Sequence, residues 1–101
     1  MAIQASLSTD CDELIIAIDG RFDFSSHQDF RSSYESLKVR PARYRVDLEG
    51  TTYLDSSALG MLLLLRDHAG GSSARIEIVN CNPEVRKILN ISNFEQLFEI
   101  T

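Results

Sequence analysis

The sequence has little positive charge and no long hydrophobic run. Ten Lys and Arg residues stand against fifteen Asp and Glu, which gives a formal net charge of -5 and a sequence pI near 4.8. Direct binding of DNA or RNA needs a basic surface that neutralises phosphates, so we expect no nucleic-acid partner. The longest apolar run, Ala58 to Leu65, is far shorter than the roughly 20 residues of a membrane-spanning helix, so we expect no membrane insertion.

The sequence has only two cysteines, and its N-terminal segment lacks the pattern of an export signal. Cys11 and Cys81 form no C-x-x-C pair and do not accompany His at the spacing of metal ligands. We therefore expect two reduced thiols, no metal and no cofactor. The N-terminal segment MAIQASLSTD lacks a basic start followed by an apolar stretch. This predicts the absence of a secretory segment and a cytoplasmic location.

The composition is that of one small globular domain. The chain has 101 residues, of which 44% are hydrophobic and 25% are charged. These fractions are close to the average of soluble proteins. No internal repeat, low-complexity segment or linker interrupts the chain, so we expect residues 1–101 to form a single domain.

Strand and helix patterns alternate along the chain. The strand patterns are Ile3–Leu7, Glu13–Asp19 with its end at Gly20, Tyr44–Leu48 and Ala74–Val79. The helical patterns run from an N-cap at Ser25 or Ser26 to Pro41, from the Asp55-Ser56-Ser57 turn to Gly70-Gly71, and from Pro83 through Leu89. We interpret Thr52–Leu54 as an extended connection and residues 94–101 as either a last strand or half a helix. The order β-β-α-β-α-β-α-(β) predicts an α/β sandwich with a mixed sheet of about four to five strands and right-handed crossover helices.

Known catalytic motifs do not occur in the sequence. It contains no G-x-S-x-G elbow, no G-x-x-x-x-G-K-[ST] loop and no H-E-x-x-H motif. His27 shares a helical face with Phe30, Tyr34 and Leu37, which favours packing at the edge of the core over a role as a base. His68 stands near the end of the second helix, where a solvated cation suits the helix dipole. We therefore expect no enzymatic activity.

Carboxylates near strand ends permit a comparison with receiver domains, which hold a divalent metal beside a phosphorylatable Asp. A receiver has a pair of acidic residues just after its first strand. Asp23 and Asp55 do not form such a pair, and Asp47 and Glu49 bracket a strand end without one. Metal-dependent aspartate chemistry is therefore disfavoured.

The Asp55-Ser56-Ser57 turn joins a strand to an apolar helix. Each of the three residues is a good N-cap, and one cap satisfies the helix, so three in succession exceed what capping demands. A helix N-terminus also tolerates a phosphate, because free N–H groups and the positive end of the dipole face it. A phosphoserine here would add a charge of about -1.5 to -2 without breaking the helix. The pattern predicts a switch that alters binding and leaves the fold intact.

The helix that follows has apolar residues on two sides. At 100° per residue, one side carries Ala58, Leu62, Leu65 and Ala69, with Leu59 and Met61 at its flanks. The opposite side carries Leu63 and Leu64, together with Gly60 and Asp67. Two large aliphatic side chains on the outer side need a cover. That cover is either a partner protein or the last helix and C-terminal tail.

These residues resemble the STAS domain family, whose best-known members are bacterial anti-sigma factor antagonists. The resemblance spans essentially the whole chain, and its specific part is the segment from Leu54 to Gly60, LDSSALG. The supporting segments are Gly20-Arg21-Phe22-Asp23, Val46-Asp47-Leu48, Asn82-Pro83-Glu84-Val85 and Ile88-Leu89. The resemblance implies a STAS-type α/β sandwich.

The resemblance also assigns residue roles. It implies that Ser56, the first serine after the Asp, is phosphorylated and that Ser57 belongs to the same helix start. Ala58 stands where many members have Gly, which stiffens the first turn and keeps the acceptor hydroxyl. Asp23 would lie near the serine loop and help contact a kinase or partner, although an Asp after Gly20 also suits a turn. The residues expected in the switch turn or at a partner surface are Asp23, Asp55, Ser57, Ala58, Leu59, Gly60, Leu63 and Leu64.

Partner switching is the function that this resemblance implies. The unphosphorylated domain would bind an anti-sigma factor, often a GHKL-type serine kinase, and thereby free a sigma factor. Phosphorylation of Ser56 would end that binding, and a PP2C-type phosphatase would restore it. A dianion beside Asp55 and near Asp23 repels an acidic partner surface, so electrostatics also predicts that phosphorylation weakens binding.

Two other functions compete with this interpretation. Some single STAS domains are subunits of membrane lipid ABC transporters, bound to the cytosolic ATPase, and this alternative stays open. A small hydrolase that uses Ser56 as its nucleophile lacks a plausible base, so we disfavour it.

Overall fold

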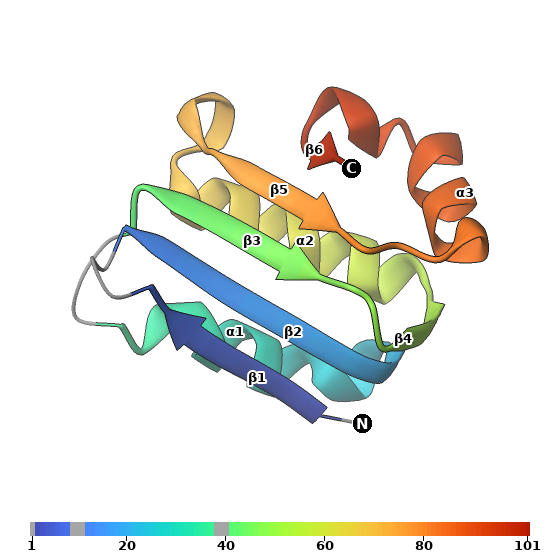
Figure 1. The fold of residues 1–101 in the computed structure, drawn as a ribbon, viewed down its shortest axis with the longest axis horizontal. Coiled ribbons are helices and arrows are strands. Elements are labelled where there is room, and N and C mark those ends of the chain that lie inside the picture. The colour runs from blue at the N-terminus through green and yellow to red at the C-terminus, as the bar shows by residue number, and fades with distance from the viewer. Residues whose placement is uncertain (1, 9–11, 38–40) are drawn as a thin grey trace.

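The structure is a computed structural model that describes residues 2–8, 12–37 and 41–101. A mixed sheet forms its centre (Figure 1), with the strand order β1-β2-β3-β5-β6 and with β4 paired to the far end of β2. Only β1 runs antiparallel to its neighbour among these pairs. The strands are β1 Ala2–Leu7, β2 Glu13–Phe22, β3 Arg43–Asp47, β4 Thr51–Leu54, β5 Ile76–Val79 and β6 Glu99–Ile100. The predicted mixed α/β fold is confirmed.

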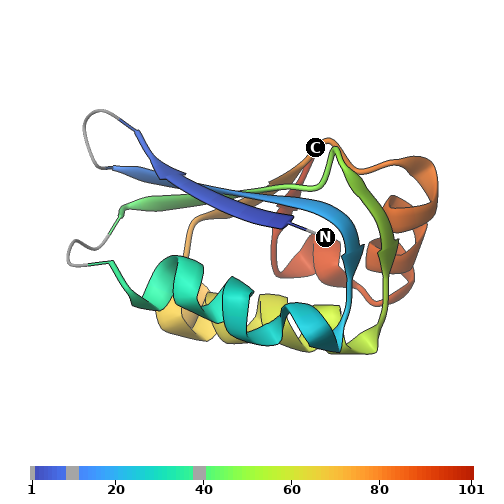
Figure 2. The same cartoon turned by 90° about the horizontal axis from the view of Figure 1, so that it is seen from below.

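The helices lie on one side of the sheet and at one end of it. Helices α1, His27–Glu35, and α2, Ser56–Ala69, cover the same face (Figure 2), and α3, Pro83–Ile91, packs beside β4. Short 3₁₀ turns, η1 Phe24–Ser26, η2 Gly71–Ser73 and η3 Phe94–Gln96, complete the described elements. The other face of the sheet carries no helix in the described part of the chain. Among the described residues, none of the helices has the length and apolar composition that a membrane span requires.

The core lies between the sheet and its two covering helices. Along β2 the side chains alternate, so that Leu14, Ile16 and Ile18 are buried toward the helices. From α1, Phe30 packs its ring against that of Phe22 at a centroid distance of 5.1 Å. Each large apolar side chain buried in this way contributes about 1.5–3 kcal/mol. The core therefore holds both helices against one face of the sheet.

Two segments near the β2 end differ from the sequence prediction. Strand β2 does not stop at Gly20 but continues to Phe22, because Gly20 adopts a φ of 85° and allows an irregularity in register there. Residues 52–54 are not an unpaired connection, since β4 pairs in parallel with β2 and adds a sixth strand to the sheet. The prediction missed this pairing because four residues are too few to show a periodic pattern.

Helix boundaries agree with the prediction at α2 and α3 and differ at α1. Ser26 is the N-cap residue of α1, one of the two predicted, but its side chain makes no capping hydrogen bond, because α1 follows directly on the 3₁₀ turn that Asp23 caps. The helix ends before Ser36, short of the expected limit at Pro41. The predicted strand 74–79 begins only at residue 76, and residues 94–101 form η3 and β6.

Candidate functional site at the ends of β2 and β4

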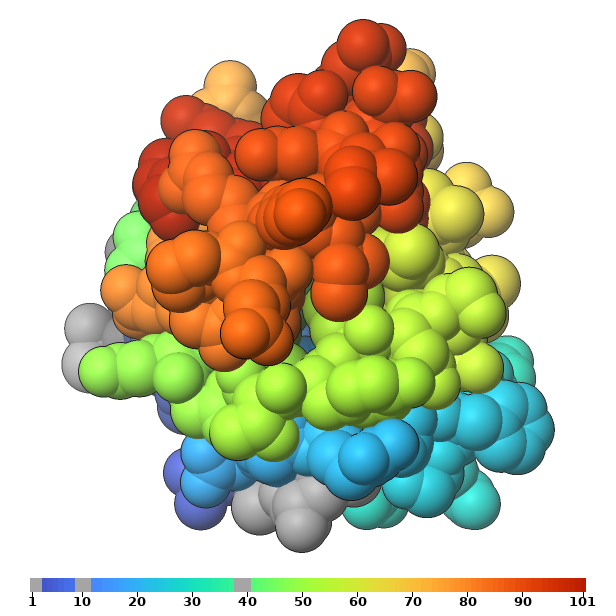
Figure 3. Space-filling view, turned by 90° about the vertical axis from the view of Figure 1, so that its right-hand side faces the viewer, coloured from blue at the N-terminus to red at the C-terminus, as the bar shows by residue number. Residues whose placement is uncertain are grey.

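The ends of β2 and β4 bring two sequence-distant turns together. Phe22 is the register partner of Leu54, so Asp23 and Asp55, the next residue on each strand, leave the sheet side by side. Figure 3 shows these blue and lime-green segments adjacent on one end of the molecule, with α3 above them in orange. The resemblance implied that Asp23 lies near the serine turn, and the strand pairing gives that proximity its structural basis.

Asp55 alone caps helix α2. Its backbone is extended and its Oδ1 accepts a hydrogen bond from the Ala58 N–H at 3.1 Å. The sequence left the cap open among three residues, and this bond assigns it to Asp55. Ser56 is exposed, and its hydroxyl has no hydrogen-bond partner among the described residues. Ser57 is half-buried in the same first turn. The Ser56 hydroxyl is thus accessible and carries no structural bond.

Asp23 organises the neighbouring turn. Its Oδ1 accepts hydrogen bonds from the Ser25 hydroxyl at 2.5 Å and from the Ser25 N–H at 3.1 Å. Its own N–H donates to the Oγ of buried Ser26 at 3.4 Å, which completes a capping box. The Ser25 hydroxyl is the main cause that lowers the pKa of Asp23, and Arg21 assists it. Asp23 therefore stays ionised at neutral pH.

Sequence reasoning assigned no role to Arg21 or Tyr53. These two residues are register partners on β2 and β4, and the guanidinium carbon of Arg21 lies 4.2 Å from the centroid of the Tyr53 ring. Its Nε also contacts Oδ2 of Asp23 at 3.3 Å. The resemblance named Arg21 only as part of a turn. Its contact with Tyr53 could not be found without knowledge that β4 pairs with β2.

Helix α2 buries one side and exposes the other, as its periodicity predicted. Ala58 is fully buried, so this residue belongs to the core and is corrected from its expected place at a partner surface. Leu59 is partly buried and Gly60 is exposed, with no atom within 4 Å of a Cβ added to it. Leu63 and Leu64 are 40% and 49% exposed. Neither α3 nor the C-terminal tail covers them, which excludes one of the two explanations for these leucines.

More exposed apolar side chains lie on elements near the serine turn. Phe24, in η1, is 73% exposed and stacks on His27 at a ring-centroid distance of 6.0 Å. Tyr53, on β4, is 40% exposed. His27 is half-buried, in agreement with its predicted place at the edge of the core. Because β2 and β4 are paired, both aromatic side chains belong to the end of the molecule that carries Ser56.

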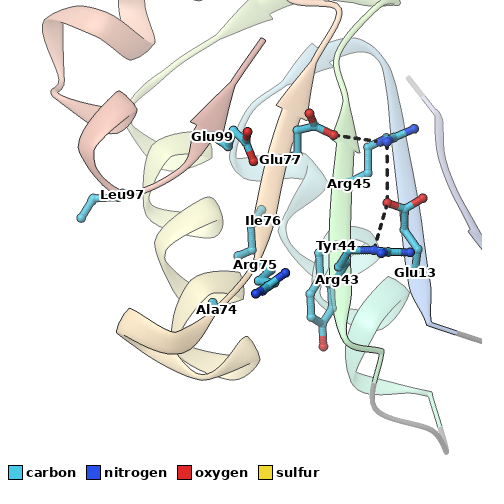
Figure 4. A pocket seen from close by; sticks show the side chains of 10 residues that line it. All are labelled: Glu13, Arg43, Tyr44, Arg45, Ala74, Arg75, Ile76, Glu77, Leu97 and Glu99. Carbon is cyan, nitrogen blue, oxygen red and sulfur yellow. Dashed lines mark hydrogen bonds and ion pairs between the residues drawn. The ribbon is translucent and has the colours of Figure 1, made fainter.

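The uncovered face of the sheet carries a different kind of surface. A hollow of about 590 Å³ lies there between β2, β3, β5 and β6 (Figure 4). Across it, Glu13 pairs with Arg43 at 3.8 Å and Arg45 at 3.7 Å, and Arg45 also pairs with Glu77 at 3.2 Å. These cross-strand pairs satisfy one another, as charges on a solvent-facing sheet commonly do.

The remaining candidate groups are not gathered into a site. Cys81 is a free, half-buried thiol whose pKa is raised by burial, and Cys11 lies outside the described residues. His68 is exposed near the end of α2, as predicted, and its ring packs on Tyr34 at a centroid distance of 4.9 Å. In the described part of the chain no three His, Cys, Asp or Glu residues cluster as metal ligands would.

Comparison with solved structures shows that other proteins share this fold. The fold matches that of SpoIIAA, an anti-sigma factor antagonist, in its unphosphorylated form, with a TM-score of 0.75, 19% identity, and coverage of 99% of this chain and 87% of that one. The phosphorylated form of the Bacillus protein matches with the same score and identity over 99% and 91% of the two chains. A sulfate transporter family protein from Wolinella succinogenes matches at 0.74, with 13% identity over 91% and 84%.

The family follows from the sequence comparison. The chain belongs to the STAS domain family, because the family model described as "Mlab, STAS domain" matches residues 5–99. A STAS-domain containing protein of Pseudomonas aeruginosa (strain UCBPP-PA14) is 67% identical over 101 residues, which are 100% of both chains.

Proposed function

We propose that this protein is an anti-sigma factor antagonist whose binding is switched off by phosphorylation of Ser56. The observation that carries the proposal is that Asp55 and Ser56 have different roles in the turn before α2. Asp55 caps the helix, while the exposed Ser56 hydroxyl has no partner among the described residues. A group that does no structural work is available for a modification that leaves the fold unchanged.

The chemistry required of Ser56 is a phosphoryl transfer by a separate kinase. The Ser56 oxygen bonds to the γ-phosphorus of ATP, ADP leaves, and the hydroxyl proton passes to a base of the kinase. A phosphatase reverses the step when water cleaves the ester and releases phosphate. We infer a GHKL-type serine kinase, which is also a candidate anti-sigma factor, and a PP2C-type phosphatase, because the family resemblance implies both. The chain itself acts as a cytoplasmic, non-enzymatic, single-domain regulator.

The surface around Ser56 supports binding of a protein partner. Leu63 and Leu64 extend from Ser56 along the outer side of α2, where a partner would bury them. A phosphate at Ser56 adds about -1.5 to -2 charges next to the carboxylates of Asp55 and Asp23. Desolvation of that dianion in an apolar interface, and its repulsion of acidic partner groups, both oppose binding.

A pull-down from the lysate of the source cell tests the proposal. Four baits are compared: wild type, Ser56→Ala, Ser56→Asp, and Ser72→Asp as a charge control at an exposed serine outside this surface. Wild type, Ser56→Ala and Ser72→Asp should retain one anti-sigma factor or GHKL kinase, identified by mass spectrometry. Ser56→Asp should lose it. Failure of Ser56→Ala to bind that partner would contradict the proposal.

The transporter alternative is tested in the same experiment. One structural neighbour is a sulfate transporter family protein, so the fold is compatible with a role at a membrane transporter. In that case all four baits should retain the ATPase of a transporter, because Ser56 would have no part in binding. This outcome would replace the switch with a transporter subunit.

A further inference from the structure

Arg21 and Tyr53 share the outer side of the β2–β4 pair, and a carboxylate residue follows each strand. Side chains alternate along a strand, and Phe22 and Leu54 both point into the core. The preceding residues, Arg21 on β2 and Tyr53 on β4, therefore point away from it, and Asp23 and Asp55 are the residues that follow the two strands. Ser56 follows Asp55 directly. The two strand ends thus bring one guanidinium and two carboxylates to the end of the sheet from which Ser56 follows.

Arg21 is held at this place by contacts that leave it able to turn. Its guanidinium carbon lies over the Tyr53 ring, 4.2 Å from the centroid, in a cation–π contact. Among the described residues its ion pair is a single Nε contact of 3.3 Å with Asp23, and its side chain is 64% exposed. A single-contact pair in water is weak. Asp23 keeps its two bonds from Ser25 when Arg21 leaves.

A phosphate at Ser56 would compete strongly for this guanidinium. It carries nearly two charges and three acceptor oxygens, whereas Asp23 offers one charge that Ser25 already shares. Arginine binds phosphate through two parallel N–H···O bonds, which a single Nε contact cannot match. The carboxylates that follow the two strands are Asp23 and Asp55, and α3, which packs beside β4, carries Glu84, Arg86 and Lys87.

We propose that Arg21 is the internal receptor for the phosphate on Ser56, turning on the Tyr53 ring from Asp23 to the phosphoryl oxygens. The proposal rests on phosphorylation at Ser56 and adds to it a structural change inside this chain. When Arg21 leaves, the turn at Asp23 that presents exposed Phe24 loses its ion pair. Phosphorylation would thus alter two parts of the exposed surface, the serine itself and the turn at the end of β2.

Phosphoserine installed at position 56 during protein synthesis allows the contact to be measured without any kinase or partner. A ³¹P NMR titration gives the second pKa of the phosphate. A nearby guanidinium stabilises the dianion and lowers that pKa. We expect Arg21→Gln to raise it by about half a pH unit, which corresponds to an exposed ion pair. Arg21→Lys should raise it less, because Lys keeps the charge and loses the paired bonds.

Arg86→Gln is the matched control, since it removes the same charge from α3. It should leave the phosphate pKa unchanged. Equal pKa values in Arg21→Gln and the parent, or a shift in Arg86→Gln alone, would overturn the proposal. Because the phosphoserine is incorporated directly, these results do not depend on whether the cell phosphorylates Ser56. Failure of the pull-down would instead contradict the switch and leave the Arg21 contact standing.

Discussion

The two sides of helix α2 have similar apolar residues and different surroundings. On the inner side, Leu62 and Leu65 are fully buried against the sheet. On the outer side, Leu63 and Leu64 are 40% and 49% exposed, in line with Ser56 and Gly60. The inner leucines are explained by the fold, since they fill its core. The outer leucines are not, and in the proposed switch they belong to the partner interface beside Ser56.

This contrast separates stability from function within one helix. Changes on the inner side should unfold the protein, whereas changes on the outer side should leave it folded and alter what it binds. The same substitution made at a leucine on each side therefore tests whether the inner side serves stability and the outer side serves binding.

The largest effect is expected from Leu62→Ala. Removal of a fully buried Leu side chain leaves a cavity and costs about 2–5 kcal/mol of unfolding free energy. Leu63→Ala is the matched control and should change it by less than about 0.5 kcal/mol. Urea denaturation followed by circular dichroism measures both. Similar losses in the two variants would show that Leu63 is part of the core and would break the comparison.

Leu64→Glu should weaken partner binding at least about tenfold, because a desolvated carboxylate is costly in an apolar interface. Its urea midpoint should stay close to that of the wild type, since the side chain is half exposed. Calorimetric titration with the partner identified by pull-down measures the affinity. Leu64→Met, which keeps the apolar surface, is the control. Unchanged affinity in Leu64→Glu would place the interface elsewhere.

Asp55 and Ser56 should differ in how much each side chain contributes to the unfolding free energy. Asp55→Ala removes the bond to the Ala58 N–H and should cost about 1 kcal/mol of unfolding free energy. Ser56→Ala removes no hydrogen bond and should cost less than about 0.5 kcal/mol. Thermal unfolding of both variants gives the answer. A larger loss in Ser56→Ala would make Ser56 a structural cap.

The smallest effect concerns Asp23. Hydrogen bonds from Ser25 lower its pKa in the folded protein. A lowered folded-state pKa means that the bonds add stability above the unfolded-state pKa of about 3.9 and lose that contribution as the pH falls through the lower folded value. A ¹³C NMR titration of the carboxyl group should show the lowered pKa, and Ser25→Ala should move it upward more than Arg21→Gln does. The reverse order would contradict the assigned cause.

Much of the fold could be predicted because its signals are local. The inner side of α2 was found from the 100° spacing of Ala58, Leu62 and Leu65, and α3 from the position of Pro83. The cap of α2 could not be chosen, because Asp55, Ser56 and Ser57 have nearly equal capping preference. Only the bond from Ala58 distinguishes them.

The parts that could not be predicted depend on contacts between distant segments. The pairing of β4 with β2 joins residues more than thirty positions apart, such as Arg21 and Tyr53. No periodic pattern in a four-residue strand reveals its partner. The candidate site therefore had its serine and aspartates in the sequence, while its arginine emerged only from the sheet.

The most direct measurement compares one partner's affinity for two forms of the protein. The partner retained in the pull-down is titrated with unmodified protein and with protein carrying phosphoserine at position 56, and the unfolding midpoint of each form is recorded. We predict a loss of affinity of at least about a hundredfold, from charge desolvation and repulsion, with similar midpoints. Equal affinity would contradict the switch. Lost affinity with a strongly lowered midpoint would show that phosphorylation acts by damaging the fold.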